Sequence, residues 1–112
     1  MEKTHNTHEL PSLQHVCGND PIRTIMQYVS IDDGFAIATD AHILVVVDLY
    51  LYLSESEISQ LNGLNIHKDD WRDLILFAKN NINAQIEVAR NNVTISNGYK
   101  SYTFRANTDQ GV

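Results

Sequence analysis

The sequence predicts an α+β domain, because runs with strand periodicity lie on both sides of one amphipathic helix. Three apolar runs come first, at residues 25–31, 35–39 and 42–49. Residues 68–79 then place apolar side chains at helical spacing, and alternating runs fill residues 84–106. Strands joined by short turns pair in antiparallel fashion. We therefore expect antiparallel sheets with one long helix and one or two short helices.

Length and composition are those of one domain over residues 1–112, with 43% hydrophobic residues to form a core. Cys17 is the single cysteine, so an internal disulfide is excluded and a reducing compartment is favoured. The first eight residues lack the apolar segment of a signal peptide. No run approaches the roughly 18 to 20 apolar residues of a membrane helix. We expect a cytoplasmic protein without membrane contact.

The charge balance disfavours a protein that coats nucleic acid. The chain has 14 acidic residues against 8 Lys and Arg, for a formal net charge of -6. Phosphate contacts require clustered Lys and Arg side chains. The helix at residues 68–79 contains both signs of charge rather than a basic stripe, namely Lys68, Arg72 and Lys79 against Asp69, Asp70 and Asp73. This pattern favours a solvated face with intrahelical ion pairs.

The N-terminal segment combines a polar start with a short apolar stretch. Residues 1–9 are interpreted as an edge strand or a loose arm, and residues 10–18 as a short helix. Pro11 suits the first turn of that helix and Gly18 its end. We expect its apolar side chains to face inward, namely Leu13, Val16 and Cys17.

The predicted strands at residues 25–31 and 35–39 are joined by Asp33-Gly34, a dipeptide that tolerates the positive φ of tight hairpins. A corner at residues 39–41 leads into the third strand, and the Asp40 carboxylate can accept hydrogen bonds from nearby backbone N–H groups there. Within the predicted strand at residues 42–49, positions 43–47 are apolar in succession. This predicts a strand that is covered on both faces or buried by a partner.

Ser54 and Glu57 have the spacing of a capping box, which predicts a short helix to Leu61. A short strand at residues 64–66 precedes the long helix, whose inward face has the spacing i, i+3, i+4 and i+7: Trp71, Leu74, Ile75 and Ala78.

A meander of three strands ends the domain, at residues 84–90, 93–96 and 99–106. Asn97-Gly98 is a strong hairpin signal within it, and we expect a frayed polar tail at 107–112. Strand parity and the helix face together predict one core: Val29, Ile37, Leu44, Val46, Trp71, Ile75, Ile86, Val88, Tyr102 and Phe104.

The corner sequence Ala38-Thr39-Asp40-Ala41-His42-Ile43-Leu44 resembles the Ala-Thr-Asp-Gly-His-Arg-Leu signature of the bacterial DNA polymerase III beta subunit, the sliding clamp. Clamp domains are built from two copies of a strand, a helix and three strands. Residues 64–106 match the second copy, and residues 26–49 match the three strands of the first. The first 20 residues match poorly. The resemblance therefore implies a single sliding-clamp-like domain, similar to the middle domain of the clamp.

The resemblance also implies a function, that of a non-catalytic accessory protein of DNA replication or repair. The family binds short peptides of its partners in a pocket to which the signature contributes. Here Thr39, His42 and Leu44 match it, while Ala41 replaces a glycine and Ile43 an arginine. The implied site for a partner peptide is thus Thr39, Ala41, His42, Ile43 and Leu44. The alternative is a purely structural corner in which Asp40 satisfies the turn.

Two readings of the function remain open at this point. A clamp ring would encircle DNA, which requires a closed homo-oligomer of a chain with one domain. The rival is a stand-alone protein-interaction module that keeps the clamp fold without binding DNA. The sequence predicts no enzyme, no cofactor and no metal site. His5 and His8 lack a second pair of ligands, and His42 near Asp40 lacks a nucleophile.

Overall fold

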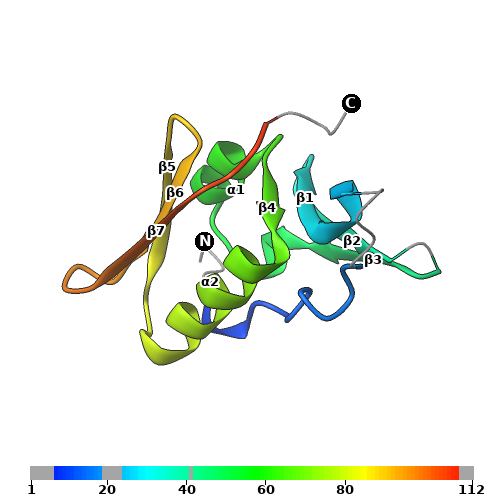
Figure 1. Cartoon of the computed structure of the whole chain (residues 1–112). Helices are drawn as coiled ribbons and strands as arrows, with labels where there is room; N and C mark the ends of the chain where they lie inside the picture. Colours follow the sequence, from blue (N-terminus) through cyan, green and yellow to red (C-terminus); the bar gives the residue numbers. More distant parts are fainter. Residues whose placement is uncertain (1–6, 19–23, 41, 109–112) are drawn as a thin grey trace.

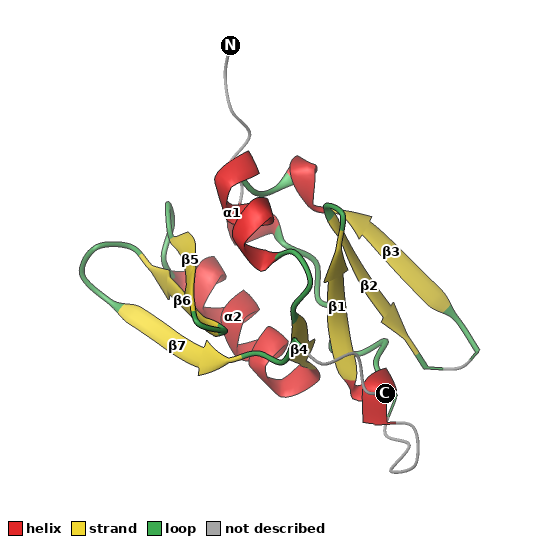
Figure 2. Cartoon of the chain, turned by 90° about the horizontal axis from the view of Figure 1, so that it is seen from above, coloured by secondary structure: helices red, strands yellow, loops and turns green. Residues whose placement is uncertain are grey.

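Two antiparallel sheets with the two α-helices between them form the described part of the chain (Figures 1 and 2). The computed structural model describes residues 7–18, 24–40 and 42–108. The first sheet has four strands in the order β3-β2-β1-β4 and the second has three in the order β5-β6-β7. The predicted α+β class, with antiparallel sheets, one long helix and a short one, is confirmed.

The first sheet contains β1 (Tyr28–Asp32), β2 (Phe35–Thr39), β3 (Leu44–Asp48) and β4 (Asn65–His67). The predicted Asp33-Gly34 turn joins β1 to β2, with φ of 52° and 87° at its two residues. Positive φ at both central positions is the geometry that suits the twist of paired strands. After β3 the chain leaves the sheet in the 3₁₀ turn η3 (Leu49–Leu51), so the third strand is shorter than predicted.

The second sheet is a meander of β5 (Gln85–Ala89), β6 (Asn92–Ser96) and β7 (Ser101–Arg105). Gly98 has φ of 95° in the turn before β7, as the Asn-Gly signal predicted. The end of the chain does not fray at residue 107. Asn65 and Asn107 exchange two backbone hydrogen bonds of 2.6 and 3.0 Å, which hold the end of the described chain beside β4. Residues 109–112 lie outside the described part.

The short helix α1 (Glu55–Leu61) begins with the predicted capping box, in which Ser54 and Glu57 satisfy each other's backbone N–H groups. The long helix α2 (Lys68–Asn80) buries its predicted face of Trp71, Leu74, Ile75 and Ala78. It contacts strands of both sheets, so this face joins the two sheets into one core.

The N-terminal segment differs from its prediction. Thr7–Glu9 and Thr24–Gln27 form the 3₁₀ turns η1 and η2, whereas residues 10–18 form no helix. The Pro11 carbonyl accepts a 3.0 Å hydrogen bond from the Trp71 indole N–H instead of bonding within a helix. Leu13 and Cys17 are nevertheless buried, as expected, and Val16 packs against the core. Burial against α2 therefore orders this segment without regular structure.

The predicted core is wrong at three positions on β2 and β3. Ile37 is only half-buried, while Leu44 and Val46 are 65% and 51% exposed. The inward positions are instead Ala36, Ala38, Val45 and Val47. The cause lies on β1, whose inward residues Val29 and Ile31 set the parity of the sheet: Ile31 lies opposite Ala36, and Ala36 opposite Val47. A shift by one residue exchanges the two faces. The other predicted core residues are buried or pack against the core.

Candidate partner-binding site

The corner between β2 and β3 is held together by the Asp40 side chain. Its Oδ1 accepts hydrogen bonds from the backbone N–H groups of His42 and Ile43, at 2.9 and 3.0 Å. These two bonds favour the ionised carboxylate and lower the pKa of Asp40. Asp40 therefore has the structural role that the sequence suggested as the alternative to a binding site.

Thr39 also serves the corner, because its hydroxyl donates to the Ile43 carbonyl at 2.8 Å. The implied site residues thus divide into two groups. Thr39 contributes to the shape of the turn, whereas the side chains of His42, Ile43 and Leu44 are exposed. Ala41 lies outside the described residues. The His42 imidazole is exposed, so it lies at the surface of the corner rather than in the core.

An apolar surface continues from this corner along the outer side of the first sheet. Ile37 lies directly opposite Val46, and Leu44 directly opposite Thr39. Side chains two residues apart share a face, so four apolar residues line it. We call this set the β2–β3 apolar face: Phe35, Ile37, Leu44 and Val46. Three of them are at least 40% exposed, and Ile43 beside them is 53% exposed. Contiguous exposed apolar surface of this kind marks interaction sites.

The outer edge of β3 is open, since β3 is the last strand of the first sheet among the described residues (Figure 2). The Leu49 N–H donates to Gly34 at 2.9 Å and the Ile43 carbonyl accepts from Asp40. In an antiparallel ladder every second residue bonds to the same neighbour. The backbone groups of Val45 and Val47 therefore face β2, and those of Leu44 and Val46 face the open side. The open edge of β3 was not predicted from the sequence, although the apolar run within residues 42–49 indicated a strand that a partner could cover.

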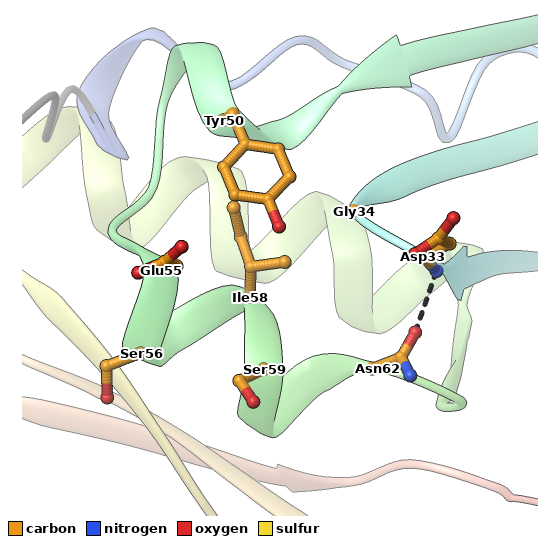
Figure 3. A pocket seen from close by; sticks show the side chains of 8 residues that line it. All are labelled: Asp33, Gly34, Tyr50, Glu55, Ser56, Ile58, Ser59 and Asn62. Carbon is orange, nitrogen blue, oxygen red and sulfur yellow. Dashed lines mark hydrogen bonds between the residues drawn. The ribbon is translucent and has the colours of Figure 1, made fainter.

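A second feature is a hollow of about 620 Å³ between the β1–β2 turn and α1. Figure 3 shows the Tyr50 ring and Ile58 on one side of it and the bonded pair Asp33 and Asn62 on the other. The Asp33 N–H donates to the Asn62 side chain at 2.7 Å. The charged residues that line the hollow are Asp33 and Glu55, and no basic side chain is among its lining residues. This lining repels phosphates and carboxylates.

Three further ionisable side chains, Tyr102, Cys17 and Arg72, are engaged in packing or in pairs. The Tyr102 hydroxyl lies 3.3 Å from Asp73 and 3.5 Å from Asp70, and burial beside these carboxylates raises the pKa of Tyr102 to about 12. Burial also raises the pKa of the Cys17 thiol, which keeps it protonated and unreactive. Arg72 pairs with Asp69 and Asp73.

Neither a metal-binding cluster nor a membrane-spanning helix is present in the described ranges. Within residues 7–18, 24–40 and 42–108, no three His, Cys, Asp or Glu side chains gather where they could hold a metal ion. No helix in this part of the chain has the length and apolar character needed to cross a bilayer.

Comparison with known proteins identified no related protein. No protein-family model, curated protein or solved structure matches this chain. The class defined by fold and site is accordingly a two-sheet α+β protein with an exposed apolar face and an open strand beside it.

Proposed function

We propose that the chain is a cytoplasmic, non-catalytic, sliding-clamp-like accessory protein of DNA replication or repair that acts by binding a protein partner. The contact would centre on Thr39, Ala41, His42, Ile43 and Leu44, where the sequence resembles the clamp signature. The observation that carries the proposal is the exposed apolar surface at this corner. Ile43 and Leu44 are 53% and 65% exposed, although residues of this type are usually buried.

The order of elements supports the same proposal. A strand, a helix and a three-stranded meander follow one another as β4, α2 and β5 to β7, and another three-stranded meander, β1 to β3, precedes them. This is the order on which the resemblance to a clamp domain rests. A partner peptide with apolar anchors would place them against Ile43 and Leu44, and the exposed His42 imidazole would hydrogen-bond the peptide backbone.

A binding titration tests the partner site. A fluorescent peptide that binds bacterial clamps is titrated with the wild-type chain and with Leu44→Ser, which we expect to weaken binding by about tenfold because an apolar contact is lost. Leu76→Ser is the matched control, since Leu76 is a 51% exposed leucine on α2, away from the corner. If the peptide does not bind at about 1 mM, or if both variants bind alike, the proposed site is wrong.

A second candidate is a stand-alone protein-interaction module that does not bind DNA. The exposed side of α2 favours it, because Arg72 there is paired with Asp69 and Asp73 at 3.6 and 3.1 Å. Charges neutralised in this way contribute little to a phosphate-binding surface. Two measurements separate the candidates. A closed oligomer of ring size that retains duplex DNA supports the clamp-like protein, whereas a monomer or dimer without DNA affinity at low salt supports the module.

A further inference from the structure

The edges of the two sheets differ in how they are protected. At β5, side chains of α1 cover the edge: Glu57 and Gln60 accept from the N–H groups of Ile86 and Val88, at 2.8 and 2.9 Å. The edge strand β7 ends in the exposed cation Arg105. The β4 strand has three residues and is bridged to Asn107. Charges, covering side chains and short length are the usual means of preventing strand-to-strand association.

The β3 strand ends in the exposed anion Asp48, but among the described residues no side-chain hydrogen bond covers its edge along residues 44–47, and this stretch has no charge. Its sequence there is Leu-Val-Val-Val, without a charge, a proline or a glycine. The N–H and C=O groups of Leu44 and Val46 face its open side, and their side chains are 65% and 51% exposed. An edge of this kind is a template for a further strand.

We propose that β3 pairs with β3 of a second copy of this chain, antiparallel and about a two-fold axis at Val45. The backbone restricts the register, because the groups that face outward must meet each other, and a two-fold axis at Val45 satisfies this requirement. Leu44 then lies opposite Val46 of the second copy, and both such pairs exchange their N–H···O=C hydrogen bonds. The result is a continuous sheet through both copies, with their β2–β3 apolar faces side by side.

Side-chain complementarity identifies a second copy as the occupant. The same register, extended two residues beyond the start of β3 into the corner, brings exposed Asp48 of one copy opposite exposed His42 of the other, twice by symmetry. Asp48 is held in place there, since its Oδ1 accepts from the Tyr50 N–H at 2.9 Å. A register centred on Val46 would instead place Leu44 opposite the Asp48 carboxylate. Cross-strand pairs of opposite character stabilise a sheet, so the Val45-centred register is favoured.

Sedimentation equilibrium of the purified chain tests this pairing, which does not depend on the proposed clamp-like function. We expect a monomer–dimer equilibrium for the wild type. Val46→Lys should weaken dimer association about tenfold or more, because a charge then lies within the strand pair. Leu76→Lys is the matched control, since Val46 and Leu76 are both 51% exposed. It should leave the equilibrium unchanged. Circular dichroism confirms that both variants are folded.

The His42–Asp48 pair supplies a second, independent arm of the test. His42→Glu should weaken the dimer, because it brings two carboxylates together at Asp48, and His42→Lys should preserve or strengthen it. A wild-type chain that remains monomeric at about 1 mM overturns the proposal, as does a dimer indifferent to both Val46→Lys and His42→Glu. No peptide or DNA is present, so this outcome is distinct from failure of the partner site.

Discussion

Glu57 on α1 and Ile86 on β5 are joined by a 2.8 Å hydrogen bond from the Ile86 N–H to the Glu57 Oε2. The other carboxylate oxygen, Oε1, accepts from the N–H and hydroxyl of Ser54 at 2.9 and 3.0 Å. The Glu57 side chain therefore caps its own helix and at the same time covers the edge of the second sheet. With Glu57 only 4% exposed, this carboxylate is a buried charge satisfied by hydrogen bonds.

Replacing Glu57 by alanine should destabilise the fold by about 2 to 4 kcal/mol, because it removes the helix cap and leaves the Ile86 N–H without its partner. Chemical denaturation measures the change. Glu55→Ala is the control on the same helix, since Glu55 is exposed, and it should change the free energy of unfolding by less than about 0.5 kcal/mol. Equal losses in both variants would mean that the contact to β5 contributes nothing.

Trp71→Ala should cost about 3 to 5 kcal/mol, because Trp71 is 1% exposed and its removal leaves a cavity where α2 meets the core. Trp71→Phe separates the two contributions of this residue. It keeps most of the packing but loses the hydrogen bond to Pro11, so part of the loss should remain. Thermal melts of the two variants test this, and an unchanged melting temperature for Trp71→Ala would refute the burial of this helix face.

Gly34→Ala should destabilise the β1–β2 hairpin for two separable reasons. Gly34 has φ of 87°, which a side chain disfavours, and a Cβ there would lie 2.5 Å from the Tyr50 ring. In a Tyr50→Ala background the clash is absent and only the backbone cost of about 1 kcal/mol remains. A double-mutant cycle measures the difference. Fully additive effects would show that the ring moves aside without cost.

Asp40→Asn should reduce stability at neutral pH, because the backbone N–H groups of His42 and Ile43 lose a charged acceptor. Folding lowers the pKa of Asp40 from its ordinary value of 3.8, so its contribution is present above that value and is lost as the pH falls through the folded pKa. The gap in unfolding free energy between wild type and variant should therefore narrow below about pH 4. His42→Ala, which removes only an exposed ring, should leave stability unchanged; a lower melting temperature would show that this imidazole supports the corner.

Tyr102 should ionise later than the exposed tyrosines in an alkaline titration followed by phenolate absorbance. Its pKa is raised from 10.0 to about 12, chiefly by burial and then by the charges of Asp70 and Asp73. The neutral phenol is thus the form that folding favours. Its contribution to stability is present below the unfolded pKa of 10.0 and is lost as the pH rises toward the folded value of about 12. Tyr102→Phe should remove this late absorbance transition. If the variant instead loses a transition at lower pH, the raised pKa belongs to another tyrosine.

Local features of the chain were predictable where a few neighbouring residues decide the outcome. Ser54 and Glu57 determine the start of α1, Asp33-Gly34 determines a hairpin turn, and the spacing from Trp71 to Ala78 determines the buried side of α2. Each depends on hydrogen bonds or periodicity within a few residues, so the sequence alone contains the information.

The orientation of the first sheet depended on tertiary structure. β2 is apolar at four successive positions, so its sequence is compatible with either face inward, and Val29 and Ile31 on the neighbouring strand decided it by packing toward the core. Leu44 and Val46 consequently became exposed, and the corner acquired its apolar surface. Likewise, no local pattern relates Glu57 to Ile86, which are 29 residues apart, because that contact exists only once α1 packs against β5. The sequence by itself therefore determined most of the elements and their turns, although not the irregular path of residues 10–18, whereas only the packing of distant segments decided which side chains and which strand edge are exposed.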